Sequence, residues 1–338
     1  MKDKHKLLLH IGPHKTGTTA LQMQLAESRN ALGTAGWIYK DRLDCGISVH
    51  AIGDMLSTGQ LKRAQPAMAE LSSFTQNMIL SSENFSRLHA NHIRLLAEAT
   101  ADFDVTIIYY IRNPLQRLFS AWQEWVKHGY SFTFPEYIMA RLANFMADPE
   151  VNDLARIKRW KTNFPRADFR VENYDIINDV PGDFFRKFLG TEYLIARPTA
   201  DRVNVSTGIA QTEAIRASNG AYRTLTTHET AQKRFKSLFL DIVGRIQDFE
   251  KQGRYIIRYR ASIDGGPFKI LEKKIMTTLP GLPKKGNFVF QTRDVEWKYI
   301  DSNIWCAEPN LMLDMSRIRC ALKEEFGRPD IDTRLRRI

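Results

Sequence analysis

The segment "HIGPHKTGTT", residues 10–19, places a lysine, two glycines and three threonines where they could hold a phosphate-like group. Gly12 and Gly17 have the spacing of the nucleotide-binding loop G-x-x-x-x-G-K-[ST], in which backbone amides surround phosphate oxygens and the lysine reaches the terminal phosphates. Here Thr18 occupies the lysine position, and Lys15 lies inside the loop. The segment therefore predicts an anion site in which the lysine reaches a 5′-phosphate or its bridging oxygen.

The residues on both sides of this loop predict a strand, a turn and a helix. Residues 6–12 form a short apolar run, and residues 18–33 have the apolar spacing of an amphipathic helix that Gly33 would close. Unpaired amides and the helix dipole both favour negative charge at a helix amino end. We therefore expect the amides of residues 16–19 to face the anion.

Three further apolar runs predict strands at 77–85, 105–114 and 166–177. The second run lacks alternation, as expected of a strand buried on both faces. Helical patterns lie between and after them, one opening at Pro114 and continuing to about His128. The alternation of strands and helices predicts an α/β fold with three layers, in which helices flank a parallel sheet of the P-loop type.

The second half of the chain has a different pattern, so residues 1–206 are interpreted as the core and residues 207–338 as a mainly helical extension or cap that packs on it. Residues 251–286 contain nine Lys or Arg and two acidic residues, within a chain of net charge +11. This segment is either a solvated basic face or a surface that attracts a polyanion or an anionic headgroup, and peripheral membrane contact is one such case.

The composition excludes several classes of protein. The chain has 338 residues, 43% hydrophobic and 26% charged, and contains no apolar window long enough to span a membrane. The first apolar stretch is too short for a signal peptide. Cys45, Cys306 and Cys320 lie far apart, which predicts neither a disulfide framework nor a zinc site. We therefore expect a cytoplasmic protein.

The loop resembles the 5′-phosphosulfate loop of the sulfotransferases that use 3′-phosphoadenosine 5′-phosphosulfate (PAPS), whose common form is P-K-S-G-T-T. His14 replaces the proline, and Thr16 replaces the serine. Ala20 stands where cytosolic members often have an adenine-stacking tryptophan. The resemblance implies that PAPS is the co-substrate and that five loop residues bind it: Lys15, Thr16, Gly17, Thr18 and Thr19.

A second segment, "IIYYIRNPLQRLFSAW", resembles the motif with which this family binds the 3′-phosphate. In that motif an arginine at the end of a strand and a serine eight residues later hold the phosphate, and Arg112 and Ser120 have this spacing. A guanidinium can engage two phosphate oxygens at once, and the serine hydroxyl adds a donor from the second turn of the helix.

Two weaker similarities extend the resemblance over residues 6–206. The segment "VENYDIINDVPGDFFRKFLG" is similar to a strand and loop of the family, which implies that Tyr174 lies against the adenine; a tyrosine packed at a strand end is the alternative. The segment "RVNVS" resembles one that closes over the nucleotide in many bacterial members. It implies that Arg202 and Ser206 contact the donor.

The candidate catalytic base is Glu83, which follows the apolar run "ILSS". Open α/β sheets place ligands at the carboxyl ends of their strands. Cytosolic relatives have a catalytic histidine at the corresponding place, whereas carbohydrate-acting relatives often use a glutamate. His14 and His50 are the competing bases, and we expect them near the substrates. Alternatively, Glu83 satisfies amides at a helix start beside Ser82.

Together these features predict a bacterial-type, PAPS-dependent sulfotransferase that acts on a hydroxyl or amine of a carbohydrate or glycolipid. Lys15 would stabilise charge on the leaving phosphate, and no metal is required because a sulfuryl group carries less charge than a phosphoryl group. One alternative is a P-loop small-molecule kinase that uses Mg-ATP, but it predicts a lysine at position 18 and a magnesium-binding aspartate. Another is a basic nucleic-acid-binding protein, for which the sequence offers only a diffuse positive segment.

Overall fold

The computed structural model describes residues 4–148, 150–193, 208–219, 236–291 and 293–301, with residues 308, 310 and 317. The described residues form two compact units. The first draws on Met1–Arg117, Asn144–Asn204 and Ile263–Arg293, and the second on Leu118–Ala143, Val205–Ser262 and Asp294–Ile338. The division predicted between residues 206 and 207 falls outside the described residues, and it stays a prediction.

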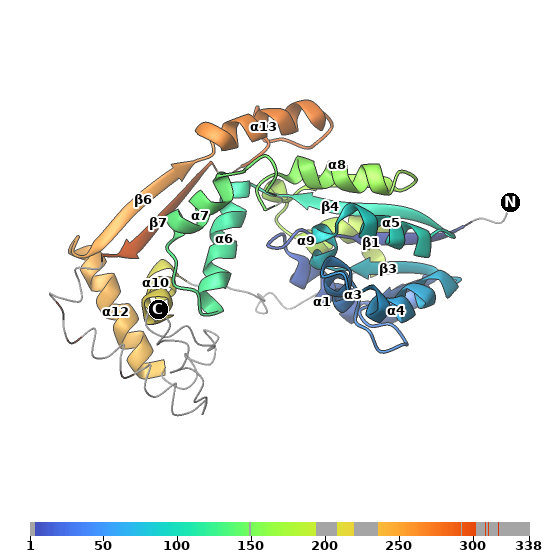
Figure 1. Cartoon of the computed structure of the whole chain (residues 1–338), viewed down its shortest axis with the longest axis horizontal. Helices are drawn as coiled ribbons and strands as arrows, with labels where there is room; N and C mark the ends of the chain where they lie inside the picture. The colour runs from blue at the N-terminus through green and yellow to red at the C-terminus, as the bar shows by residue number, and fades with distance from the viewer. Residues whose placement is uncertain are drawn as a thin grey trace. The chain divides into compact units, whose positions relative to one another are not determined.

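The first unit is built on a sheet of five parallel strands in the order β2-β3-β1-β4-β5 (Figure 1). The strands are β1 (His5–His10), β2 (Trp37–Lys40), β3 (Asn77–Ser81), β4 (Phe103–Ile111) and β5 (Asp168–Asn173). The parallel sheet confirms the predicted fold class. The sequence did not reveal β2, because a strand of four residues is too short to show a period.

Along the chain, helices lie between these strands and after the last of them. They are α1 (Thr18–Glu27), α2 (Arg29–Thr34), α3 (Val49–Ser57), α4 (Leu61–Ser73), α5 (Ala90–Ala99), α6 (Pro114–Lys127), α8 (Asp153–Asn163), α9 (Val180–Phe184) and α13 (Gly266–Thr278). Short helical segments also occur: η1 (Glu83–Arg87) follows β3, η2 (Tyr174–Ile176) follows β5, and η3 (Phe185–Leu189) and η4 (Thr191–Tyr193) follow α9. The single helix predicted at 18–33 is wrong, since Ser28 separates two helices. The Ser28 hydroxyl accepts a hydrogen bond from Gln24 Nε2 (3.3 Å).

Helices cover both faces of the sheet, as two neighbouring residues of β4 show. Successive side chains of a strand point to opposite faces. The Tyr109 hydroxyl donates to Asp153 of α8, whereas the Tyr110 hydroxyl lies 3.3 Å from an Asp183 carboxylate oxygen of α9. Helices α8 and α9 therefore lie on opposite faces, and the unit has three layers.

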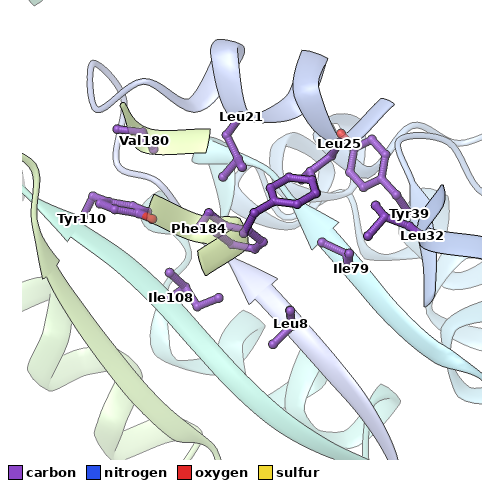
Figure 2. Close-up of a cluster of buried hydrophobic side chains, with 11 residues drawn as sticks. Leu8, Leu21, Leu25, Leu32, Tyr39, Ile79, Ile108, Tyr110, Val180 and Phe184 are labelled. Carbon is purple, nitrogen blue, oxygen red and sulfur yellow. The ribbon is translucent and has the colours of Figure 1, made fainter. Parts of the chain in front are cut away.

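The core on the α9 side brings the first helix onto the strands. Its buried residues come from β1, β2, β3 and β4, from α1 and α2, and from the segment 180–185 (Figure 2). Leu21 and Leu25 of α1 lie over Leu8 and Ile79 of the sheet and are fully buried. Burying a side chain of this size contributes about 1.5 to 3 kcal/mol, so α1 is fixed on the sheet, and with it the loop that precedes it.

The second unit consists of helices and a two-stranded antiparallel sheet. Besides most of α6, it contains α7 (Phe134–Leu142), α10 (Ile209–Asn219), α12 (Lys236–Lys251), β6 (Ile256–Ser262) and β7 (Asp294–Ile300). Trp297 of β7 is buried against Phe134, with ring centroids 4.9 Å apart. The β6–β7 pair was not predicted. In the part of the chain that the structure describes, no helix is long and apolar enough to cross a membrane.

Candidate functional site

The loop between β1 and α1 lies at the carboxyl end of the sheet, next to the ends of β3 and β4. The Ile11 amide donates to the Ile108 carbonyl (3.1 Å), and the Ser82 amide donates to the His10 carbonyl (3.0 Å). Strand β1 stands between β3 and β4, where the chain changes direction across the sheet. Such a switch point is where open α/β sheets bind ligands.

Hydroxyl groups brace the loop from inside. The buried Thr16 hydroxyl donates to the Pro13 carbonyl (2.7 Å), and the Thr18 hydroxyl donates more weakly to the same oxygen (3.4 Å). Thr19 is exposed. The first amide of α1 that bonds within the helix is that of Leu21, to the Gly17 carbonyl. The three preceding amides, at the helix start, are therefore the donors available to an anion.

Gly12 brings this loop into contact with Glu83. Its φ is 85°, and a Cβ at this position would lie 2.8 Å from the Glu83 Cα. No side chain fits at that distance, so glycine is needed both for the backbone conformation and for the close approach. The candidate base is thereby held directly against the candidate phosphate loop.

The Glu83 carboxylate is surrounded by three side chains. One of its oxygens, Oε1, lies 3.7 Å from His14 Nδ1 and 3.7 Å from His50 Nε2, and the other accepts a hydrogen bond from Gln22 Nε2 (3.3 Å). The side chain is 15% exposed. The cap of η1 is the Ser82 hydroxyl, which accepts a hydrogen bond from the Asn84 amide (3.2 Å), and not the Glu83 carboxylate. The three residues predicted as candidate bases therefore form one cluster.

Close packing places His50 in this cluster. His50 is the second residue of α3, and its Nδ1 lies 3.1 Å from the Ser82 hydroxyl. Gly53 of the same helix lets α3 approach η1, since a Cβ there would lie 2.7 Å from the Asn84 Cβ. The helix begins at Val49, after the Ser48 cap, so His50 lies in its first turn.

His14 is a neutral imidazole near pH 7. Burial, followed by the nearby Arg87 guanidinium, lowers the pKa of His14 to about 4 against the opposing effect of Glu83. Its Nε2 is buried without a hydrogen-bond partner among the described residues. In the contact between His14 and Glu83, the imidazole is therefore uncharged at neutral pH.

Arg112 follows β4 and lies against the loop. Its Nη1 donates to the Lys15 carbonyl, and its Cζ lies 4.9 Å from the centroid of the Tyr174 ring. Lys15 has a φ of 67°, a left-handed conformation that residues with a side chain seldom adopt. The hydrogen bond from Arg112 helps to hold Lys15 in this conformation. Backbone conformations of this kind are found often at functional sites.

The guanidinium of the half-buried Arg112 has one unpaired buried donor in the part of the chain that the structure describes. Its Nε is buried without an acceptor among the described residues. Burial lowers the pKa of Arg112, whereas Tyr174 and Asp175 raise it. An unpaired buried donor is costly, so an anionic oxygen at this position would be bound favourably.

Tyr174 and Asp175 follow β5 and complete this side of the site. The Tyr174 Cε2 lies 3.6 Å from where a Cβ of Gly17 would stand. Asp175 accepts a hydrogen bond from the Asn113 amide (2.7 Å), and burial raises its pKa to about 6 although Asn113 and Arg112 lower it. The loops after β1, β4 and β5 therefore meet around the Lys15 backbone.

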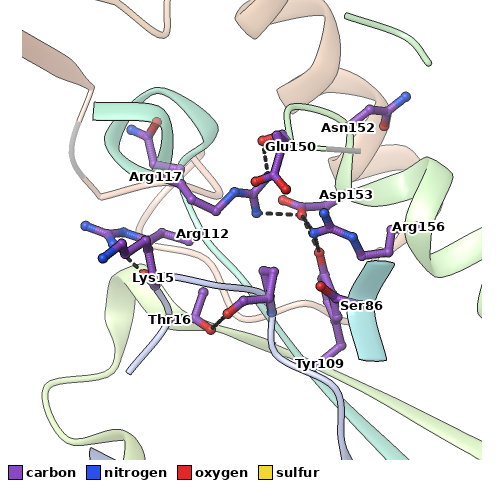
Figure 3. A network of polar contacts seen from close by, with 12 residues as sticks. Lys15, Thr16, Ser86, Tyr109, Arg112, Arg117, Glu150, Asn152, Asp153 and Arg156 are labelled. Atoms are coloured by element: carbon purple, nitrogen blue, oxygen red, sulfur yellow. Dashed lines mark hydrogen bonds and ion pairs between the residues drawn. The ribbon is translucent and has the colours of Figure 1, made fainter. Parts of the chain in front are cut away.

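A buried ionic network lies beside these residues (Figure 3). Arg117 donates to Asp153 (2.6 Å) and to the Glu150 carbonyl (2.7 Å), and Arg156 donates to the Tyr109 hydroxyl (2.7 Å). Burial lowers the pKa of Arg117, but the neighbouring Asp153 carboxylate raises it, and the pKa is raised on balance. The network joins β4, α6 and α8, and so fixes the strand from which Arg112 emerges.

The remaining predicted residues are not placed at the site. Ser120 lies in the second turn of α6, in the part of the helix that belongs to the second unit, so its position relative to Arg112 stays a prediction. Arg202 and Ser206 lie outside the described residues. In the described ranges, no group of three or more His, Cys, Asp or Glu side chains is arranged to hold a metal ion.

Sequence reasoning missed Gln22 and Asp175. Gln22 lies one turn after Thr18 on α1, so the helical period could have placed it on the same face as the loop. Its Nε2 donates to the Ser81 carbonyl (3.1 Å) as well as to Glu83, which ties the carboxylate to the end of β3. Asp175 directly follows Tyr174, but only the fold shows that it meets the Asn113 amide.

Comparisons with known proteins return only distant similarity. No protein-family model and no curated protein matches the sequence. Among solved structures, mouse sulfotransferase SULT7A1 complexed with PAP aligns with 15% identity and a TM-score of 0.32, over 64% of this chain and 65% of that chain. A sulfotransferase from Alicyclobacillus acidocaldarius aligns with 12% identity and a TM-score of 0.33, over 75% of this chain and 97% of that chain. At such low scores, we base the functional proposal on the residues of this chain.

Proposed function

We propose that this protein is a PAPS-dependent sulfotransferase that transfers a sulfuryl group to a hydroxyl or amine of a carbohydrate or glycolipid. The observation that carries the proposal is the contact between Gly12 of the loop and Glu83. It sets an anion-binding helix start beside a carboxylate that two histidines and a glutamine surround. A transfer reaction that removes a proton from its acceptor needs this juxtaposition.

The loop and Arg112 would hold the donor. The amides at the start of α1 and the Lys15 side chain bind the 5′-phosphosulfate end, and Arg112 and Tyr174 contact the nucleoside or its 3′-phosphate. During transfer, the bond between sulfur and the bridging phosphate oxygen breaks, and the charge develops on that oxygen. Lys15 and the helix amides stabilise this charge.

Glu83 would act as the base. As the acceptor oxygen or nitrogen forms its bond to sulfur, its proton passes to the Glu83 carboxylate. Gln22 orients this carboxylate, and the neutral His14 lies beside it. The products are the sulfated acceptor and adenosine 3′,5′-bisphosphate. The choice of a carbohydrate acceptor is supported by a glutamate at this position, as in carbohydrate-acting members of the family that the motifs resemble.

Thermal unfolding with different nucleotides tests this function. Adenosine 3′,5′-bisphosphate without magnesium should raise the melting temperature, because a ligand that binds only the folded state stabilises it by about 2.7 kcal/mol at one hundred times its Kd. ATP and AMP should raise it much less. A larger effect of Mg-ATP would replace this proposal with a kinase. Incubation with radiolabelled PAPS and a panel of glycans, glycolipids and small alcohols then identifies the acceptor class.

A further inference from the structure

The structure separates the basic segment 251–286 into two parts with different surroundings. In the first part, which belongs to the second unit, the basic side chains have acidic or carbonyl partners. These contacts are Lys251 with Asp248, Arg254 with Glu308, Arg260 with Asp294, and Arg258 with the Glu250 carbonyl. The charge of this part is therefore largely compensated within the unit.

The second part, in the first unit, has an excess of uncompensated charge. Lys269, Lys273 and Lys274 of α13 are exposed, and so are Lys284 and Lys285 after it. Among the described residues, none of these five lysines has a carboxylate within ion-pair distance. Exposed lysines at positions four apart on a helix, such as 269 and 273, repel each other by a few tenths of a kcal/mol. The helix thus bears a cost for this charge.

The one acidic residue of α13 cannot offset that charge, because it faces inward. Glu272 is 4% exposed and pairs with Arg293 (2.8 Å). It also accepts a hydrogen bond from the Val289 amide (3.2 Å), which ties the segment after Phe288 to the helix. The buried face of α13 is completed by Phe268, Leu271 and Ile275, so the lysines lie on its outer face.

Large apolar side chains are exposed around the same lysines. Ile270 is 50% exposed, Phe288 47% and Met146 39%. The Lys274 Nζ lies 3.9 Å from the Met146 sulfur, and the backbones of Lys285 and Phe288 are bonded to each other. The centroid of the Phe288 ring lies 4.1 Å from the Cζ of Arg293, the residue that pairs with Glu272, so the segment 284–288 is linked to α13. We call the exposed lysines and large apolar residues of α13 and of this segment, together with Met146, the α13 surface: Met146, Lys269, Ile270, Lys273, Lys274, Lys284, Lys285 and Phe288.

We propose that the α13 surface docks the protein on the headgroup region of an anionic lipid bilayer. Lysines next to a membrane are attracted to acidic headgroups, while exposed aliphatic and aromatic side chains such as Ile270 and Phe288 enter the boundary with the acyl chains. A polyanionic glycan or nucleic acid would engage the lysines and could stack on Phe288, but it would leave the aliphatic side chains of Ile270 and Met146 in water. The combination therefore favours a lipid surface, and it does not depend on the proposed transfer reaction.

Flotation of the full-length protein with vesicles tests this proposal. Vesicles of phosphatidylcholine containing 30% phosphatidylglycerol should bind the protein at low ionic strength, and pure phosphatidylcholine should bind it much less. The double variant Lys273→Gln/Lys274→Gln should bind about 25-fold more weakly, since each lysine near such a surface contributes about five-fold, or about 1 kcal/mol. Phe288→Ser should weaken binding about five-fold, and this loss should persist at high salt.

Lys62 and Arg63 provide a matched control, because they are also two adjacent, exposed basic residues on a helix, α4. Lys62→Gln/Arg63→Gln removes the same charge and should leave vesicle binding within about two-fold of the original. Equal losses for the two double variants would show attraction by net charge alone and overturn the proposal. Binding to a heparin column that depends on Lys273 and Lys274, without vesicle binding, would assign the surface to a polyanion instead.

Discussion

Replacing Gly12 by alanine tests whether the loop and Glu83 are in direct contact. Gly12 has a φ of 85°, and the added Cβ would lie 2.8 Å from the Glu83 Cα and 2.9 Å from its Cβ. Because one of these atoms belongs to the backbone, a side-chain rotation cannot relieve the overlap. The loop, or the start of η1, must move.

The destabilisation expected for Gly12→Ala has a backbone part and a steric part. The substitution Gly36→Ala measures the backbone part alone. The left-handed backbone costs an alanine about 1 to 2 kcal/mol, and the steric overlap adds about 1 to 3 kcal/mol, as overpacking does in cores. Gly12→Ala should therefore lower the free energy of unfolding by about 2 to 5 kcal/mol. Gly36 has a φ of 77° with no atom within 4 Å of an added Cβ. Gly36→Ala should cost only the backbone part.

Urea unfolding of both variants gives the two costs, and sulfuryl transfer measured with radiolabelled PAPS gives the functional effect. Since a displacement of about 1 Å in a reacting group can reduce turnover about 100-fold, Gly12→Ala should lose transfer to that extent even where it is folded. Gly36→Ala should retain it. Equal destabilisation by both substitutions, with transfer unchanged in both, would refute the contact between the loop and the base.

Three other predictions concern the donor, the base and pH. Arg112→Ala removes a guanidinium that carries a charge-assisted contact worth about 1.5 to 3 kcal/mol, so calorimetry should show the affinity for adenosine 3′,5′-bisphosphate reduced about 10- to 100-fold; unchanged affinity would exclude Arg112 from the donor site. Glu83→Gln should abolish transfer and leave nucleotide affinity within about two-fold, and retained transfer would move the base to a histidine. Burial lowers the pKa of His10 from 6.5 to about 3, so the unfolded chain takes up this proton first as the pH falls. The contribution of His10 to stability is therefore complete above pH 6.5 and is lost toward pH 3, with about 3 kcal/mol gone by pH 4. In urea unfolding, the variant His10→Asn should lose less stability than the original protein between pH 7 and pH 4. Identical pH profiles would show that His10 does not have a lowered pKa in the folded protein.

The candidate site shows why some of its residues can be found from sequence and others cannot. The loop of residues 12–19 was recognisable, because glycines, a lysine and threonines at fixed offsets are a local requirement of an anion-binding turn. Arg112 was recognisable because it ends an apolar run. Gln22, in contrast, has no local feature that distinguishes it from a surface glutamine, and the role proposed for it rests only on its bond to Glu83.

The sequence by itself determined the local elements of this protein. These are four of the five strands of the parallel sheet, the turn that carries Lys15 inside the loop, and the helix that begins at Pro114. The spacing of apolar residues and the positions of glycine and proline influence secondary structure over only a few residues. They can therefore be recognised directly in the sequence. The tertiary structure alone decided that His14, His50 and Glu83, up to 69 residues apart, form one cluster. It also decided that only part of the basic segment carries uncompensated charge. Both outcomes depend on the order of the strands and on which helices pack together, and these are set by contacts between distant residues that no local pattern records.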